Sequence, residues 1–178
     1  GDAVEENKAA IFAISMFFGD IRLERFIGKV RDGEFITGPG KISNVLLQDR
    51  HDWVQHFTLS AGLTLAGGRG IADFIGEAKE VDDATNKASG FSFTDLAADR
   101  AGVRFAEIAT GSADGARRIQ DFLARPISEQ QFLPEIRDLP EGLTAAQFEA
   151  QYGERDSEKY LRMVAEIDRR IDTIPMYR

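Results

Sequence analysis

The residues best suited to chemistry lie in three short segments in the middle of the chain, each of which mixes carboxylates with apolar side chains. Each segment carries a pair of polar residues three or four positions apart, a spacing that places both side chains on one face of a helix. The pairs are Asp52 with His56, Glu77 with Glu80, and Asp95 with Asp99. If three helices pack these faces together, one imidazole and several carboxylates converge.

Such a grouping supports two kinds of chemistry. A divalent metal ion would take nitrogen from the imidazole and oxygen from the carboxylates, and carboxylates crowded together could have pKa values pushed apart for acid–base catalysis. The candidate metal ligands are His56, Glu77, Glu80, Asp95 and Asp99. As an enzyme, the protein would be a metal-dependent hydrolase in which one carboxylate acts as base toward a bound water.

The same residues also have purely structural interpretations. His56 could pack between helices with one ring nitrogen bonded to a carboxylate. Asp95 stands three residues after Ser92, the spacing of a capping box at a helix start. Lys79 and Asp83 are four residues apart and could form an ion pair on one helix face.

Other catalytic signatures are absent from the sequence. Ser60 follows His56 by one helical turn, but it lacks the Gly-x-Ser-x-Gly elbow of a hydrolase nucleophile. The run Gly67-Gly68-Arg69-Gly70 lacks the Gly-Lys-Ser/Thr ending of a phosphate-binding loop, so we interpret it as the end of a helix. His51 is expected on the surface at a helix start.

Composition narrows the class of protein. The chain has 178 residues, of which 43% are hydrophobic, and this length fits one domain with a sizeable core. With 30 acidic against 22 basic residues and a net charge of -8, it is a poor candidate to bind nucleic acid or an anionic membrane surface. Its apolar runs are too short to cross a bilayer. A small-molecule or protein partner stays open.

The elements that must position these residues follow helical periodicity, with Gly or Pro between them. We expect helices over 4–18, 21–31, 43–66 (interrupted near 49–51), 71–86, 93–109, 115–124 and 156–173, with further helix starts at Ser128 and Thr144. The apolar stripe predicted for the last helix is Tyr160, Leu161, Val164, Ile167 and Ile171. The fold class is therefore all-α, a single-domain multi-helix bundle over 1–178. Residues 43–109 form its core, 4–31 its N-terminal helices and 113–178 a covering segment.

The central third of the chain, about 49–106, resembles the VanZ-like and YfiM-like lipoprotein families. The resemblance is carried by Asp52-x-x-x-His56-Phe57, Gly76-x-x-Lys79-Glu80-x-x-Asp83 and Phe91-Ser92-x-x-Asp95-Leu96-x-x-Asp99-x-x-Gly102. Those families show Asp-Lys-x-x-His-Phe, Lys-Glu-x-x-Asp and Phe-Ser-x-x-Asp-Leu-x-x-Asn-x-x-Gly. This chain departs from them at Trp53 and Asp99, where the families have Lys and Asn. It also carries charges at Arg69, Asp73 and Arg104, whereas the family helices are usually membrane-associated.

The resemblance implies a helical protein of the bacterial envelope with one shared polar cluster. On the matching positions, that cluster would comprise Asp52, His56, Lys79, Glu80, Asp83, Asp95 and Asp99. The chain begins with Gly1-Asp2 rather than Met, from which we expect that a signal peptide has been removed. A periplasmic or secreted location follows, with the cytoplasm as the alternative.

Three functions stay open on the sequence. The first is a non-enzymatic envelope protein whose His–Lys–carboxylate cluster organises the fold or a ligand pocket. The second is the metal-dependent hydrolase that uses His56 and the clustered Glu and Asp. The third is an interaction module that acts through the acidic C-terminal helix. Lys79 discriminates between the first two, because an inward-pointing ammonium would repel a divalent cation.

Overall fold

The computed structural model describes residues 1–19, 23, 45–67, 90–154 and 156–178. Within them the α-helices are α1 (Ala3–Ile14), α3 (His51–Ala66), α5 (Phe93–Gly111), α6 (Ala113–Leu123), α7 (Ala145–Tyr152) and α8 (Glu158–Asp172). A π-helical turn over Ser15–Gly19 extends α1, and short 3₁₀ turns occupy Glu129–Gln131 and Pro175–Tyr177. The only strand-like pairings in these residues are two isolated bridges. The protein is an all-α, single-domain helical bundle, as predicted.

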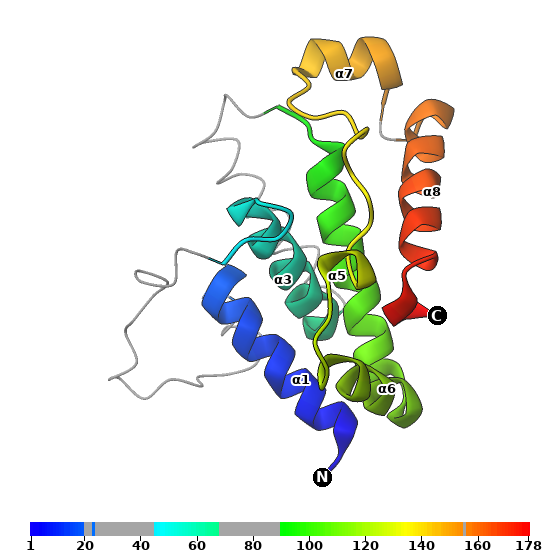
Figure 1. Cartoon of the computed structure of the whole chain (residues 1–178). Coiled ribbons are helices and arrows are strands. Elements are labelled where there is room, and N and C mark those ends of the chain that lie inside the picture. The colour runs from blue at the N-terminus through cyan, green and yellow to red at the C-terminus, as the bar shows by residue number, and fades with distance from the viewer. Residues whose placement is uncertain (20–22, 24–44, 68–89, 155) are drawn as a thin grey trace, which may run out of the picture.

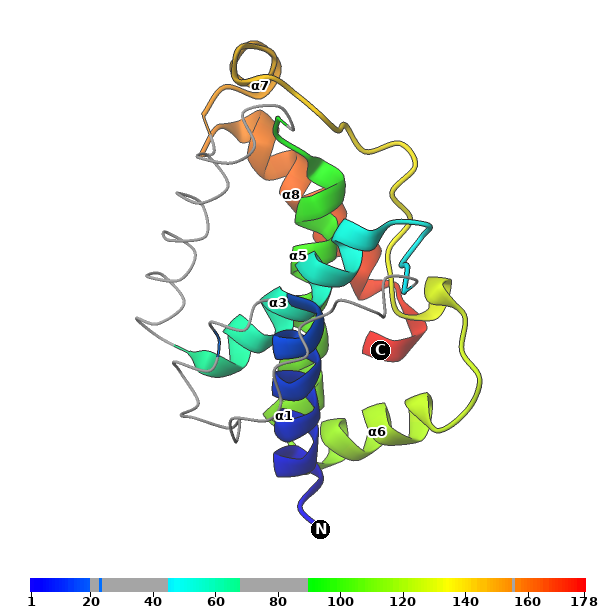
Figure 2. The same cartoon turned by 90° about the vertical axis from the view of Figure 1, so that its left-hand side faces the viewer.

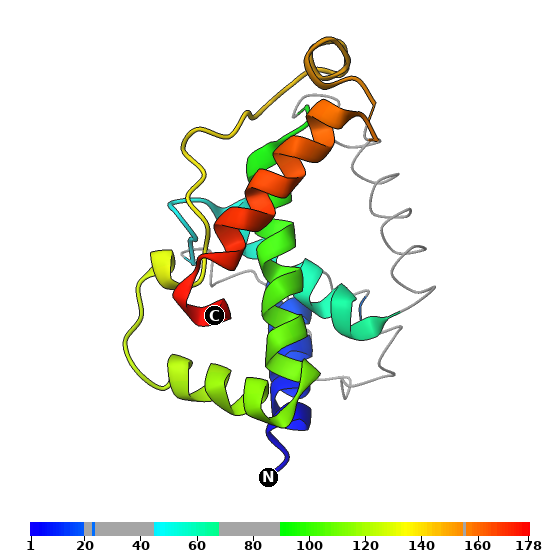
Figure 3. The same cartoon turned by 90° about the vertical axis from the view of Figure 1, so that its right-hand side faces the viewer.

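Helix α5 is the central element of the described fold. Helices α3 and α1 lie on one side of it and α8 lies on the other (Figure 1). Turning the molecule shows α1 in front of α5 and α6 leaving the foot of α5 at a steep angle (Figure 2). From the opposite side, α8 runs diagonally along α5 (Figure 3). Because α5 contacts helices on both sides, a site that combines residues from several helices is best placed along α5.

Small side chains allow α5 to approach α3 closely. Most of the buried residues of α5 are small. They are Ala97, Ala98, Ala101, Gly102, Ala106 and Ala109. A Cβ atom added at Gly102 would lie 2.2 Å from the carbonyl oxygen of Phe57 on α3. The backbones of the two helices are therefore in direct contact at this point, which brings their polar residues within hydrogen-bonding reach.

The start of α3 differs from the prediction. We expected a helix from 43 with an interruption near 49–51, but the described residues 45–50 form a tight turn and α3 begins at His51. Leu47 and Arg50 exchange two backbone hydrogen bonds of 3.0 Å, and the intervening residues Gln48 and Asp49 have positive φ angles. The predicted break near 49–51 is therefore the start of α3, and the helix predicted before it is wrong over 45–50.

The helix-start signals are confirmed by their hydrogen bonds. Ser92 accepts from the backbone N–H of Asp95 at the start of α5, and Thr144 and Gln147 form a reciprocal capping box at the start of α7. The same box forms at Ser128. The helix predicted over 4–18 is present as α1 and its π-helical turn.

The covering helix α8 docks through a narrower stripe than predicted. Ile167 and Ile171 are buried, but Leu161 is 52% exposed, so its assignment to the stripe is wrong. The preceding residue, Tyr160, supplies the inward contact in that turn, and successive positions on a helix point about 100° apart. Of the described helices, none has the length and apolar character needed to cross a bilayer.

Candidate functional site

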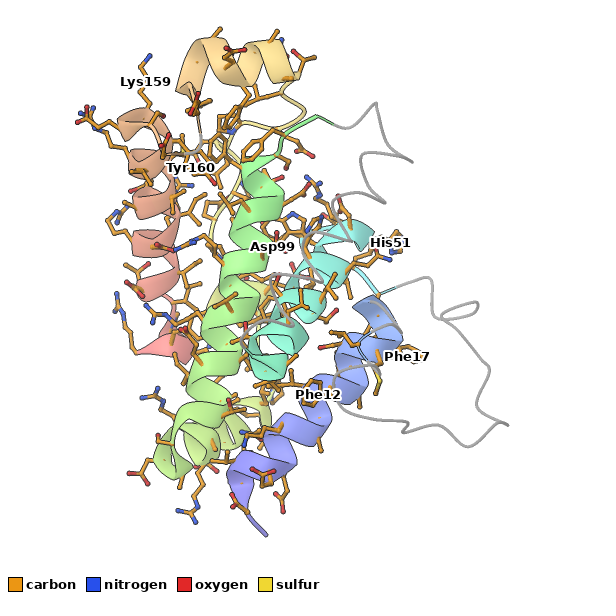
Figure 4. All side chains as sticks on the ribbon, turned by 180° about the vertical axis from the view of Figure 1, so that it is seen from behind. Phe12, Phe17, His51, Asp99, Lys159 and Tyr160 are labelled. Atoms are coloured by element: carbon orange, nitrogen blue, oxygen red, sulfur yellow. The ribbon has the colours of Figure 1, made fainter. Side chains whose placement is uncertain are left out.

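The centre of the site is a contact between α3 and α5. Oδ1 of Asp99, on α5, lies 3.1 Å from Nδ1 of His56 and accepts a hydrogen bond of 2.8 Å from the hydroxyl of Ser60. Figure 4 shows Asp99 on the side of α5 that faces α3, whereas His51, the first residue of α3, points away from α5. His56 and Ser60 are four residues apart on α3, so one carboxylate on α5 holds two successive turns of α3.

A second carboxylate faces the other edge of the imidazole. Oδ2 of Asp95, one turn before Asp99 on α5, lies 3.8 Å from Nε2 of His56. The other oxygen of Asp95 accepts a hydrogen bond of 3.1 Å from Nη2 of Arg50. The ring of His56 therefore sits between two carboxylates, and Asp95 links it to a guanidinium.

Arg50 extends the network beyond the two helices. Its Nε and Nη2 donate to the two oxygens of Asp52 at 3.0 and 2.5 Å, which is a bidentate pair. Its Nη1 donates to Thr94 at 3.1 Å and to Glu141 at 2.6 Å. Glu141 belongs to the extended segment before α7, so Arg50 joins that segment to α3 and α5.

The electrostatics of the site favour a protonated imidazole. Burial by itself lowers the pKa of His56, but the hydrogen bond and charge of Asp99 oppose it, together with the charges of Asp95 and Asp52, and the pKa rises to about 9. The hydrogen bond from Arg50 lowers the pKa of Asp52 against the opposing effect of burial. Burial raises the pKa of Asp95, against the opposing effects of His56 and Arg50.

Negative charge is in excess in the described part of the site. The cations are Arg50 and protonated His56. They face four carboxylates, those of Asp52, Asp95, Asp99 and Glu141. The imidazole is 37% exposed, so solvent relieves part of this imbalance.

The sequence-predicted site residues meet different outcomes. Asp52, His56, Asp95 and Asp99 come together, with Asp52 joined to the others through Arg50. Glu77, Lys79, Glu80 and Asp83 lie outside the described residues. Considering only the residues whose placement is described, we find no group of three or more His, Asp or Glu side chains arranged to hold a metal ion. With two of its five proposed ligands outside this part of the chain, the metal site stays a prediction.

Asp95 takes part in one half of the capping box predicted with Ser92, and it belongs to the polar cluster. Its backbone N–H is capped by Ser92, as the capping signal indicated. Its carboxylate, however, lies against Arg50 and His56. Helix capping therefore fixes where Asp95 stands, and the side chain contributes to the polar cluster.

The sequence reasoning missed Arg50 and Glu141 as members of the site. Arg50 had a local signal, because it stands two residues before Asp52 at the start of a polar helical turn. Glu141 had none, since 91 residues separate it from its partner in the chain. Ser60 was weighed only as a nucleophile, and the structure shows its hydroxyl bonded to Asp99.

The contacts do not form a serine-hydrolase arrangement. In such a triad the serine donates to the histidine and the carboxylate holds the opposite ring nitrogen. Here the Ser60 hydroxyl donates to Asp99, on the same oxygen that faces His56.

A cavity of about 190 Å³ lies outside this site, between α5 and α8, where Arg100 is paired with Asp168 and Arg104 with Asp172.

Comparison of the chain with protein-family models, curated proteins and solved structures finds no match. The resemblance to VanZ-like and YfiM-like proteins therefore stays a prediction, and the function must be argued from the geometry of the cluster.

Proposed function

We propose that this chain is a non-enzymatic, envelope-associated helical protein in which a His–Lys–carboxylate cluster organises the fold around α3 and α5. The observation that carries the proposal is the shared use of Asp99, whose Oδ1 atom faces His56 and accepts from Ser60. An oxygen engaged in this way holds two helices together and is poorly placed to act on a substrate.

The remaining carboxylates support the same function. Asp95 lies between Arg50 and His56, and both Asp52 and Glu141 accept from Arg50. Every described carboxylate of the cluster is thus engaged by a cation of the protein itself. Networks of this kind specify one packing arrangement when all their members are satisfied.

Lys79 is the residue we propose to supply the missing positive charge. Two cations facing four carboxylates leave the described part of the cluster with two negative charges in excess. The family resemblance implies that Lys79 belongs with the same residues, and its ammonium group would offset half of this excess without any metal ion.

The same charge excess favours one alternative function, the metal-dependent hydrolase. A divalent cation held by His56, Asp95 and Asp99 with Glu77 and Glu80 would also offset part of the negative charge, and a bound water would then be the nucleophile. The two functions exclude each other, because the metal ion and the ammonium group of Lys79 would occupy the same position in the cluster.

Thermal unfolding separates the two functions. The chelator-treated protein is heated alone and with Mg²⁺, Mn²⁺, Zn²⁺ or Ca²⁺, beside the variants His56→Ala, Lys79→Met and Glu80→Ala. Asp168→Ala, in a distant ion pair, is the matched control. We expect no response to any ion and a lowered midpoint for His56→Ala and Lys79→Met. An ion that raises the midpoint of the wild type but not of His56→Ala or Glu80→Ala supports the hydrolase instead, because a ligand that binds only the native state stabilises it.

The envelope location is tested separately, on cells that express the full natural gene. We expect the protein in the periplasmic fraction released by osmotic shock or in the culture medium. Recovery with a cytoplasmic marker enzyme would overturn this part of the proposal and leave the structural role of the cluster untouched.

A further inference from the structure

Five aromatic rings gather where the N-terminal ends of α5 and α8 meet α7. This aromatic cluster consists of Phe91, Phe93, Phe148, Tyr152 and Tyr160. The centroids of Phe91 and Phe148 are 4.5 Å apart, and those of Phe93 and Tyr152 are 4.8 Å apart. In Figure 4 Tyr160 points from α8 toward this cluster, whereas its neighbour Lys159 points away from it.

Helix α7 is attached to this cluster by two rings. None of its residues is buried, and all except Phe148 and Tyr152 are exposed. These two side chains are four residues apart and so share one face of the helix. Phe93, beneath them, is fully buried. A helix with so little buried surface is expected to open locally at much lower cost than the rest of the fold.

The chain is fixed on both sides of α7, which limits any such opening to α7 itself. Before it, Leu143 and Phe91 exchange backbone hydrogen bonds of 2.7 and 2.9 Å. After it, Ser157 caps α8 by accepting from the backbone N–H of Tyr160. Between α7 and α8 stands Gly153, with φ at +72°, a conformation that glycine adopts without strain.

We propose that α7 is a hinged lid over the aromatic cluster, and that the space it uncovers binds a flat, apolar ring compound. When α7 swings away, the rings of Phe148 and Tyr152 leave, while those of Phe91, Phe93 and Tyr160 stay in contact with one another. An incoming aromatic ring restores the same edge-to-face and tilted contacts that the lid rings make with Phe91, Phe93 and Tyr160. Ligand binding at this site does not depend on the function proposed for the polar cluster.

Hydrogen exchange tests the lid. In the wild type we expect the amides of α7 to exchange at least about tenfold faster than those of α5 and α8, because local opening is cheaper than global unfolding. If the amides of α7, α5 and α8 are equally protected from exchange, the lid proposal is wrong, because α7 would then open only when the whole domain unfolds.

Binding of N-phenyl-1-naphthylamine, a fluorescent apolar ring compound, tests the site. Apparent affinity falls with the fraction of protein that is open, so removing the competing rings in Phe148→Ala/Tyr152→Ala should tighten binding by about tenfold. The milder variant Phe148→Leu should tighten dye binding by a smaller factor. It replaces the double variant in the test if the double variant does not fold. Leu161→Ala, an exposed position on α8, is the control and should bind as the wild type does.

Two results would overturn the ligand assignment. One is unchanged dye binding in both lid variants while α8 keeps its protection from exchange. The other is displacement of the dye by tetramethylammonium at equal concentration, which would assign the cluster to an organic cation held over ring faces.

Discussion

Nδ1 of His56 lies 3.1 Å from Oδ1 of Asp99, and this contact joins two helices across 43 residues of sequence. The same oxygen accepts from Ser60, so the carboxylate of Asp99 is the point at which α5 holds two turns of α3. The strength, pH dependence and geometric origin of this contact can each be measured.

Loss of the Asp99 carboxylate should destabilise the fold. Asp99→Ala leaves the polar groups of His56 and Ser60 without their acceptor, and we expect a loss of about 1–3 kcal/mol in the free energy of unfolding. Asp99→Asn keeps an acceptor oxygen and should lose less. Urea unfolding of both variants and of a His56→Ala/Asp99→Ala double-mutant cycle is the measurement. Additive single-variant effects would show that the contact contributes nothing.

Stability should fall as pH rises through the pKa of His56. That pKa is about 9 in the folded protein against 6.5 for an unperturbed histidine. Because the folded state binds the proton more tightly, the stabilisation is complete below about pH 6.5 and is lost as pH rises toward 9. Urea midpoints measured across this window should decline in the wild type and decline less in His56→Gln. An NMR titration that places the imidazole near 6.5 would contradict the assignment.

Gly102 should tolerate no side chain. The Cβ atom of Gly102→Ala would lie 2.2 Å from the carbonyl oxygen of Phe57, so α3 and α5 would have to separate. We expect a loss of about 3 kcal/mol, the upper range for overpacking in a core. Gly111→Ala is the matched control, because a Cβ there meets no atom within 4 Å and should gain up to about 1 kcal/mol in helix propensity. Similar thermal midpoints for the two variants would refute the close crossing.

Helix α8 should depend on its buried isoleucines more than on its ion pairs. Ile167→Ala removes a fully buried side chain and should cost about 2–5 kcal/mol. Asp168→Ala breaks the pair with Arg100, whose groups are more than a third exposed, and should cost less than about 1 kcal/mol. Chemical unfolding of the two variants side by side gives the comparison. The reverse order of effects would mean that charge holds α8 in place.

Within the described residues, most of the helical framework could be predicted from the sequence, because its signals are local. The helices predicted over 21–31 and 71–86 lie outside those residues. Ser92 and Thr144 stand at helix starts with the capping spacing, and both caps form. The apolar stripe predicted for α8 is confirmed at Ile167 and Ile171 and is wrong at Leu161. Periodicity defines a face only to within about one position, and the neighbouring helices decide which residue at its edge is covered.

The candidate site was predictable in part for the same reason. His56, Asp95 and Asp99 were identified because each shares a helix face with another polar residue. The ion pair between Arg50 and Glu141 was not predictable, since it depends on where the segment before α7 crosses the start of α3.

The sequence by itself determined the all-α class, most helix starts and the polar faces of α3 and α5, since these depend on residues within a few positions of one another. Only the tertiary structure decided that Asp99 would be shared by His56 and Ser60, and that Asp95 would face a guanidinium as well as an imidazole. The physical reason is distance. These partners are 39 to 45 residues apart, and the absence of a side chain at Gly102 allows α3 and α5 to come close enough for their polar atoms to meet.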